Sequence, residues 1–273
     1  MTDLDASPLG HATEYAERYA PGLLFPVERA LLRAELGLPD ALPFRGVDLW
    51  TAYELSWLDP AGRPQVAIAT LAVPAASPRL VESKSVKLYL TAFNQTRFSS
   101  EAEVAAAIER DMSGAAGAAV GVTLTLPQGF AALPHAELAG ESLDVLPIAV
   151  HRFEPDPEAL AAGGPIVAEL LTTRLFRSVC PVTGQPDYAS VQLAYRGVRI
   201  DHAGLLRYLV SFRRHPGFHE HCVERIFVDV WRRCAPESLS VYARFMRRGG
   251  IDINPYRTSG EGTPPSNART ARQ

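Results

Sequence analysis

The chain has 273 residues, of which 47% are apolar and 21% are charged, and its formal net charge is −3. An apolar fraction of this size can fill one large core or two packed modules, and we expect two. The small negative charge argues against a protein that grips nucleic acid through a strong positive field, so a small ligand is favoured.

The first twenty residues carry acids and polar side chains where a secretory signal needs a basic start and an apolar stretch. No apolar run reaches the roughly 18 residues that a membrane-spanning helix needs. The three cysteines are scattered and form no CxxC pair, so a disulfide framework is not expected. We therefore predict a cytoplasmic protein without a membrane partner.

Hydrophobic periodicity divides the first part of the chain into strands and a helix. In chain order, we expect an apolar anchor at 22–26, a hairpin of strands 47–58 and 66–73 closed by the turn 59–64, a helix at 101–112, and strands at 120–126 and 143–153. Ser99 or Ser100 is the expected N-cap of the helix, and the glycines of residues 114–117 are expected to end it.

Residues 154–165 are rich in proline, glycine and alanine, and this composition indicates a linker. The second part is expected to contain strands at 166–175 and 190–200, helices at 202–213 and 218–233, and a strand at 239–247. The order of elements resembles that of the first part. We therefore predict an α+β fold with antiparallel sheets, with modules at 1–155 and 156–257 and a disordered polar tail at 258–273.

Cys180 lies in the segment Arg177-Ser-Val-Cys-Pro-Val-Thr-Gly-Gln-Pro-Asp187, a loop rich in proline and glycine between two predicted strands. Such a loop can present a nucleophilic thiol to a ligand, and Asp187 can become its acid or base when the loop folds back. The alternative is a small buried hydrophobic side chain, which this context alone favours.

Cys222 and Cys234 fall within or at the end of the predicted helix 218–233, where we expect them to be packing residues. Three histidines, His215, His219 and His221, lie beside Cys222 and raise the possibility of a metal site. Neither HExxH nor a paired cysteine motif is present, so no metal is expected.

The segment Glu82-Ser-Lys-Ser-Val-Lys-Leu-Tyr89 brings a carboxylate, two hydroxyls and two ammonium groups together before an expected helix. It can be a phosphate site at the helix start, but this segment alone favours a capping motif with a solvated basic face. A second basic cluster surrounds Gly249-Gly250 and consists of Arg244, Arg247, Arg248 and Arg257. Because no GxGxxG follows a strand, a dinucleotide would have to bind outside a Rossmann fold.

Several segments together resemble the 7-cyano-7-deazaguanine reductases of queuosine biosynthesis, the QueF family. The segments are 82–98, Ser178-Val-Cys-Pro-Val-Thr-Gly-Gln-Pro-Asp187, Phe25-Pro26, Ser211-Phe-Arg-Arg-His-Pro-Gly-Phe-His-Glu220 and Arg248-Gly-Gly-Ile-Asp-Ile-Asn-Pro-Tyr-Arg257. The resemblance implies the long form of the family, with two tandem tunnelling-fold (T-fold) modules whose antiparallel sheets carry paired helices on one face. It also implies a homodimer.

The implied reaction reduces a nitrile to a primary amine with two NADPH. The resemblance makes Cys180 the nucleophile that forms a covalent thioimide and Asp187 the general acid. It assigns the guanine edge to Glu220, with Glu82 as a second anchor, and places His219 near the reacting centre.

The resemblance further places substrate contacts at Val81, Glu82 and Ser83, and NADPH contacts at Ser83, Lys84, Arg248 and Gly249. The cationic side chains suit the 2′-phosphate that distinguishes NADPH from NADH. Two other functions stay open on the residues alone: a zinc-dependent purine cyclohydrolase-like enzyme that uses the histidine and cysteine cluster, and a non-catalytic purine- or pterin-binding module that keeps Glu82 and Glu220.

Overall fold

The computed structural model describes residues 16, 18–38, 41–261 and 263–273. The first twenty residues, on which the prediction of no secretory signal rests, lie mostly outside the described residues. The chain forms two compact units. Unit 1 contains the described residues of 1–35, 48–133 and 247–253, and unit 2 contains those of 36–47, 134–246 and 254–273. The units therefore do not meet at residue 155 as expected, because Leu36, Phe44 and Leu143 pack into the core of unit 2.

Unit 1 combines an antiparallel sheet with two main helices. Its strands are β1 (Pro26–Glu28), β2 (Arg45–Leu58, of which residues 48–58 belong to this unit), β3 (Pro64–Pro74), β4 (Arg79–Val81) and β5 (Gly121–Thr125), and its helices are α1 (Arg29–Ala34), α2 (Ser83–Thr91) and α3 (Glu101–Ala116). β2, β3 and β5 are neighbours in one sheet, while β1 pairs antiparallel with β4. The predicted hairpin is confirmed as β2 and β3, and the Asp59 carboxylate accepts hydrogen bonds from the Ala61 and Arg63 amides in the turn.

The core of unit 1 lies between its helices and its sheet. Alternate side chains of β3, including Ala69 and Leu71, are buried against Val104 and Ile108 of α3 and Tyr89 of α2. The period of two in the strand and the apolar stripe of the helix therefore meet at one surface.

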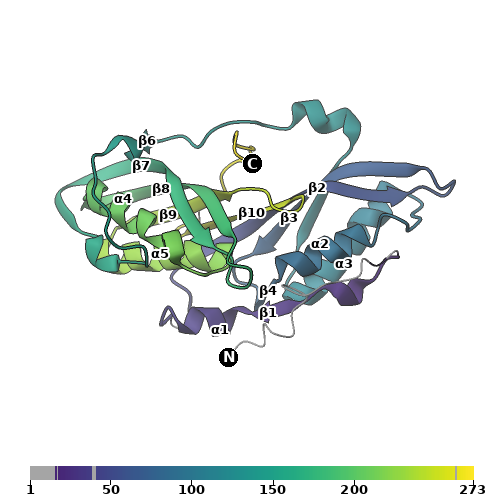
Figure 1. Cartoon of the computed structure of the whole chain (residues 1–273), viewed down its shortest axis with the longest axis horizontal. Coiled ribbons are helices and arrows are strands. Elements are labelled where there is room, and N and C mark those ends of the chain that lie inside the picture. The colour runs from purple at the N-terminus through teal and green to yellow at the C-terminus, as the bar shows by residue number, and fades with distance from the viewer. Residues whose placement is uncertain (1–15, 17, 39–40, 262) are drawn as a thin grey trace. The chain divides into compact units, whose positions relative to one another are not determined.

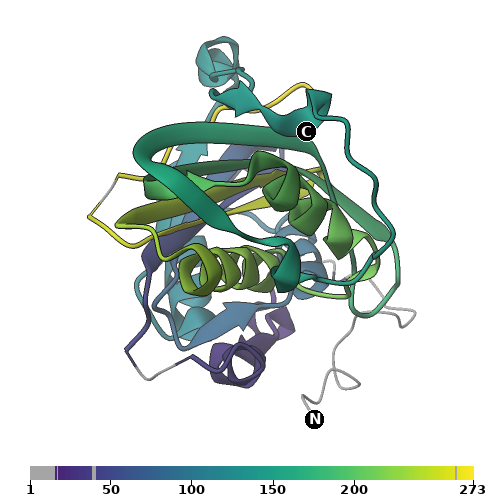
Figure 2. The same cartoon turned by 90° about the vertical axis from the view of Figure 1, so that its left-hand side faces the viewer.

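Unit 2 is built around a long antiparallel ribbon. Its strands are β6 (Glu141–Ser142), β7 (Ala162–Val179), β8 (Pro186–Ile200) and β9 (Ser238–Phe245), with β10 (Ile251–Thr258) beside β9, and its helices are α4 (His202–Ser211) and α5 (His219–Cys234). Figures 1 and 2 show α4 and α5 side by side on one face of this sheet. Ala189, Val191 and Leu193 of β8 point to that face and are buried in the same cluster as the helices.

Two predictions for the segment before β7 are wrong. Residues 143–153 do not form a strand, because the chain makes a 3-10 turn at Leu143–Val145 and Pro147, which has no N–H, follows it. The Asp144 carboxylate fixes the turn by accepting hydrogen bonds from the Thr173 hydroxyl and the Arg174 amide. The expected linker 154–165 also contains a 3-10 turn, Pro157–Ala159, and the beginning of β7.

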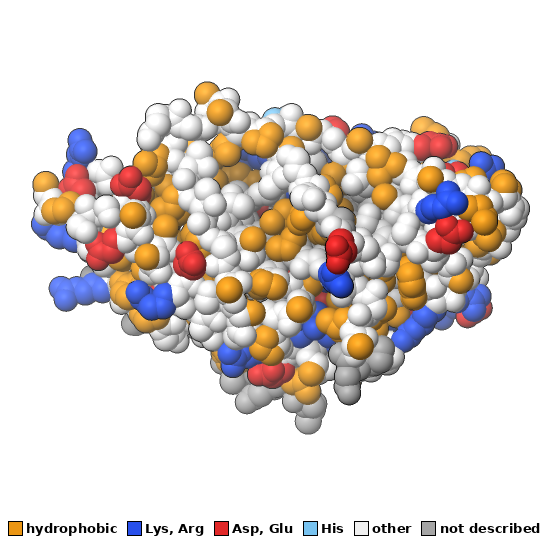
Figure 3. Space-filling view, turned by 180° about the vertical axis from the view of Figure 1, so that it is seen from behind, with side chains coloured by type: hydrophobic (Ala, Val, Ile, Leu, Met, Phe, Trp, Pro, Cys, Tyr) orange, Lys and Arg blue, Asp and Glu red, His pale blue; other side chains and the backbone are white. Residues whose placement is uncertain are grey.

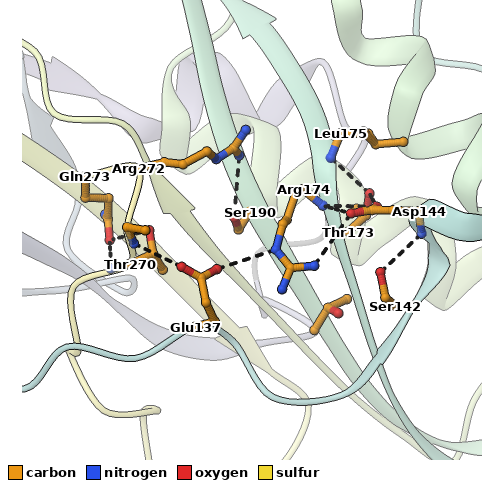
Figure 4. Close-up of polar contacts among 12 residues, drawn as sticks. Glu137, Ser142, Asp144, Thr173, Arg174, Leu175, Ser190, Thr270, Arg272 and Gln273 are labelled. Carbon is orange, nitrogen blue, oxygen red and sulfur yellow. Dashed lines mark hydrogen bonds and ion pairs between the residues drawn. The ribbon is translucent and has the colours of Figure 1, made fainter.

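The tail differs from the expected disorder, because its polar side chains find fixed partners in unit 2. Arg269 forms a parallel bridge with His135. The Gln273 amide donates to the Phe245 carbonyl at 2.8 Å and to Asn254 Oδ1 at 2.9 Å. Figure 4 shows the tail residues Thr270, Arg272 and Gln273 near Glu137 and Arg174.

Within the described residues, no helix combines the length and the apolar character that crossing a membrane requires.

The start of α3 gives a test of the fold. The Ser100 hydroxyl caps the helix by accepting a hydrogen bond from the Glu103 amide at 3.2 Å. We expect Ser100→Ala to lower the free energy of unfolding by about 1 kcal/mol, since that amide loses its acceptor. Urea denaturation measures the change, and Ser100→Asp should retain most of the stability. Equal loss in the two variants would contradict the capping role.

Candidate active site

The loop that carries Cys180 continues the ladder between β7 and β8. Ser178 pairs with Asp187, and Val179 pairs with Pro186. The Cys180 amide then donates to the Gln185 carbonyl at 2.8 Å, which adds one more step in the same register. Cys180 is therefore held by strand geometry rather than by a free loop.

This register places Cys180 and Asp187 on the same face of the ribbon. Asp187 is opposite Ser178, and Cys180 follows Ser178 by two residues, so the two functional side chains are diagonal neighbours. Residues that are diagonal neighbours across two antiparallel strands are about 7–8 Å apart. Their side chains can therefore both contact a small group that lies between them. Both are buried, with 8% of Cys180 and 2% of Asp187 exposed. The predicted return of the loop is confirmed.

A second segment braces the end of β7. The Val179 amide donates to the His215 carbonyl at 3.0 Å, and the Gly217 amide donates to the Val179 carbonyl at 3.1 Å. The chain before α5 therefore fixes both backbone groups of the residue next to Cys180. Sequence reasoning did not find this brace, because the partners lie 36 and 38 residues apart.

His219, the first residue of α5, lies beside Asp187. Its Nε2 is 3.5 Å from Asp187 Oδ2, and its ring stacks on Phe245 with centroids 3.8 Å apart and planes 2° from parallel. Its Nδ1 is buried without a hydrogen-bond partner among the described residues. The stacking fixes the plane of the ring beside Asp187. Phe245 is a support that the sequence analysis missed, although alternation in β9 marks it as inward-facing.

Glu220 follows in the first turn of α5 and is 3% exposed. A carboxylate there interacts favourably with the positive end of the helix. Phe218, the N-cap residue, provides no side-chain cap. Unit 2 thus brings four of the predicted site residues onto the β7–β8 ribbon and the start of α5: Cys180, Asp187, His219 and Glu220.

The other two cysteines are packing residues, as predicted. Burial raises the pKa of Cys222 to about 12, and burial also raises the pKa of Cys234. Both thiols therefore stay protonated near neutral pH and are poor nucleophiles. Within the described residues, no group of three or more histidine, cysteine or acidic side chains is arranged to hold a metal ion.

Unit 1 contains the other predicted site residues, at the start of α2. Glu82 is the N-cap and is fully buried, and its carboxylate accepts hydrogen bonds from the Lys84 amide at 2.7 Å and the Ser85 amide at 2.8 Å. The Glu82 amide donates to the Phe25 carbonyl. Val81 ends β4 immediately before this cap, and Ser83 begins the helix.

Of the two predictions for this segment, the capping motif is therefore correct for the backbone amides at the start of α2. Because a carboxylate already occupies the Lys84 and Ser85 amides, they are not available to a phosphate. Cationic side chains remain as the phosphate-binding groups of this segment. Lys84 and Lys87 are one turn apart, so they lie on the same side of α2.

The Gly249-Gly250 turn packs against that side of α2. Gly249 and Gly250 have φ of +58° and +81°, and the Arg248 amide donates to the Ile251 carbonyl at 2.9 Å, which is the geometry of a two-residue hairpin turn. A Cβ on Gly249 would lie 3.1 Å from Lys87 Cδ. The missing side chain thus lets the turn that carries Arg248 approach Lys87 closely.

The four arginines of the second basic cluster are divided between the two units. Arg257 is fully buried in unit 2 and pairs with Glu224 at 2.8 Å. Arg244 is also buried in unit 2, whereas Arg247 of unit 1 stacks over the Tyr53 ring at 4.6 Å. Arg247 and Arg248 adjoin the glycine turn in unit 1, whereas Arg244 and Arg257 belong to unit 2.

Charges of both signs are interspersed on the face drawn in Figure 3, and no continuous field of one sign covers that face.

Comparison with known proteins decides the family. A model described as "Nitrile reductase, 7-cyano-7-deazaguanine-reductase N-term" matches residues 15–124, and one described as "QueF-like protein" matches residues 186–263. The NADPH-dependent 7-cyano-7-deazaguanine reductase of Bordetella pertussis is 56% identical over 271 residues, which cover 99% of each chain. The chain belongs to the 7-cyano-7-deazaguanine reductase family.

Further members of the reductase family agree with this assignment. The protein of that name from Chromobacterium violaceum is 56% identical over 98% of this chain and 96% of its own, and that from Burkholderia pseudomallei is 57% identical over 98% of both. An archaeosine synthase QueF-Like in the apo form covers 37% of this chain and 99% of its own, with a TM-score of 0.32 and 20% identity. The two family matches in one chain fit the predicted pair of tandem T-fold modules.

His215 provides a test of the brace beside Cys180. Burial lowers the pKa of His215 from 6.5 to about 4, with the charges of Arg225 and His221 as lesser causes. The unfolded chain therefore binds this proton below about pH 6.5, while the folded protein resists it until about pH 4.

Stability should consequently fall as the pH drops from 6.5 towards 4, and His215→Gln should lose less over that interval than the parent protein. Urea denaturation at pH 7 and pH 5 measures both losses. An equal loss in the two proteins would show that His215 does not resist protonation in the folded state.

Proposed function

We propose that this protein reduces the nitrile of 7-cyano-7-deazaguanine to the aminomethyl group of 7-aminomethyl-7-deazaguanine with NADPH, a step of queuosine biosynthesis. The observation that carries the proposal is the diagonal pair of buried Cys180 and Asp187 in a chain 56% identical to reductases of that name. A thiol and a carboxyl group at this spacing suit addition to a carbon–nitrogen triple bond.

In the first step, Cys180 adds to the nitrile carbon. The thiol proton passes to Asp187, the new carbon–sulfur bond forms, and one π electron pair of the nitrile moves onto nitrogen. Asp187 then delivers the proton to that nitrogen. The product is a covalent thioimide in which every atom of the thiol and the nitrile is retained, and Asp187 is again a carboxylate.

The neighbours of this pair bind and orient the substrate. Glu220 accepts two adjacent N–H groups of the guanine-like edge, which a buried carboxylate does well. His219, whose ring stacks on Phe245, lies beside the reacting centre with Nε2 3.5 Å from Asp187 Oδ2. Burial excludes water, which would hydrolyse an imine released after the first reduction.

The substrate contacts proposed in unit 1 are Val81, Glu82 and Ser83. Glu82 Oε1 accepts hydrogen bonds from the Lys84 amide and, at 3.4 Å, from the Ser83 hydroxyl, whereas Oε2 accepts from the Ser85 amide and keeps a further lone pair. Glu82 can therefore cap α2 and still accept a hydrogen bond from the substrate.

The residues of unit 1 also fit NADPH. Ser83, Lys84, Arg248 and Gly249 would hold it, with the cations on its phosphates and the bare Gly249 turn allowing close approach. Bound NADPH would supply hydride, and two hydrides together with two protons convert a nitrile to a primary amine. We further propose that the protein acts as a cytoplasmic homodimer, which sedimentation velocity on purified protein tests for the oligomeric state.

The covalent step has a direct test. Mixing the protein with 7-cyano-7-deazaguanine in the absence of NADPH should give an adduct whose mass equals the sum of the two, because addition releases nothing. Intact-protein mass spectrometry detects it. Cys180→Ala should form none, while Cys234→Ala should form it fully, since Cys234 is a packing residue at the end of α5. An adduct that survives Cys180→Ala would exclude the proposed nucleophile.

The cofactor assignment predicts a change in nucleotide preference. Lys84→Gln and Arg248→Gln should raise the KM for NADPH at least tenfold and change the KM for NADH by much less, because only NADPH carries the 2′-phosphate. Steady-state kinetics with the two nucleotides measures this ratio. Arg63→Gln, a substitution of an exposed arginine paired with Asp59 in the β2–β3 turn, is the control. If both variants weaken the two nucleotides equally, the cations do not read the 2′-phosphate.

A further inference from the structure

Arg244 of β9 is a buried cation without an acidic partner. It is 1% exposed, and its guanidinium donates only to neutral acceptors: the Tyr242 hydroxyl at 2.8 Å, Gln273 Oε1 at 2.9 Å, and Asn267 Oδ1. No carboxylate of the described residues forms an ion pair with it, and its Nη2 lacks a hydrogen-bond partner among them.

A guanidinium in this setting needs an anion. Arginine cannot release its proton in a protein, so burial cannot be relieved by neutralisation. Neutral acceptors satisfy individual N–H groups but leave the whole positive charge uncompensated, and buried charges are normally paired. Nη2, which has no hydrogen-bond partner among the described residues, can donate to such an anion.

Arg244 lines a cavity of about 330 Å³ together with Tyr188, Met246, Arg272 and Gln273. This volume is at the small end of the range for ligand sites. The side chains of the lining include two arginines and no carboxylate. An aromatic ring and a thioether complete it, which suit the apolar body of a small molecule.

The nearby acid is already engaged. Glu137 accepts a hydrogen bond from the Ala271 amide at 3.0 Å and pairs with Arg174 at 3.5 Å (Figure 4). Arg272 reaches in the other direction, with its Nη2 3.5 Å from Ser190 Oγ. The Ala271 amide and Arg174 are larger causes of the lowered pKa of Glu137 than Arg272 is, so Glu137 compensates the charge of Arg272 only in part.

The cavity is on the opposite face of the sheet from the proposed nucleophile. Asp187 and Phe245 point towards the face that carries α5, while their chain neighbours Tyr188 and Arg244 point to the other face. A ligand in the cavity is consequently separate from the Cys180–Asp187 pair.

We propose that this cavity is an oxyanion-binding site, in which Arg244 and Arg272 hold the phosphate or carboxylate group of a small organic molecule. Tyr188 and Met246 contact the apolar part of that molecule. Because Arg272 and Gln273 belong to the tail, the same ligand also holds the tail on the sheet. This binding is additional to the proposed reductase chemistry and does not depend on it.

Isothermal titration calorimetry with phenyl phosphate and with benzoate tests the site. At least one of the two should bind saturably, and the arm that binds identifies the oxyanion. Arg272→Gln should weaken binding at least tenfold, and Arg244→Gln should abolish it. Arg272 is exposed, so its variant should fold even if Arg244→Gln does not.

Two control variants remove a positive charge elsewhere. Arg196→Gln changes an exposed arginine paired with Glu237, further along the same face of β8, and Lys84→Gln changes the proposed cofactor site. Both should bind the probe as the parent protein does. The proposal is overturned if neither probe binds saturably, if Arg272→Gln binds as tightly as the parent, or if Lys84→Gln removes the binding.

Discussion

The hydrogen bond from the Cys180 amide to the Gln185 carbonyl is the constraint on which the candidate site depends. It extends the β7–β8 ladder by one step past the last strand pair. The strand register therefore fixes the position of Cys180, although Cys180 lies at the start of the loop. A slip of one residue would send the thiol to the other face of the ribbon, away from Asp187. The His215 and Gly217 contacts to Val179 oppose such a slip.

The two faces of the unit 2 sheet carry different proposed sites because of the alternation of side chains along the strands. Side chains alternate along β8 and β9, so neighbours in the sequence point in opposite directions. Asp187 and Phe245 serve the face that α5 covers, where the carboxylate and the stacked His219 are. Tyr188 and Arg244 serve the other face, where the tail provides the cover. One ribbon thereby supports a proposed reaction on one face and a proposed anion site on the other, so the acidic and the basic side chains are on opposite faces of the sheet.

Unit 1 shows how one side chain can satisfy a fold and a proposed function together. Glu82 caps α2 through both carboxylate oxygens, which leaves the helix start closed to anions. Anion binding must then rely on the lysines of α2 and on Arg248. The Gly249 turn makes that possible, because its positive φ and its missing side chain let it approach Lys87.

Local patterns in the sequence determined the hairpin β2–β3, the helices α3 and α5, and the packing role of Cys222, because these depend on periodicity and turn chemistry within a few residues. The motif around Cys180 and Asp187 was also visible. Tertiary structure alone decided that residues 143–153 are not a strand, that Arg244 and Arg257 are buried in unit 2 whereas the glycine turn belongs to unit 1, and that the tail is held by β9. These outcomes rest on contacts between residues far apart in the chain, such as Asp144 with Arg174 and Glu224 with Arg257, and no local pattern encodes them.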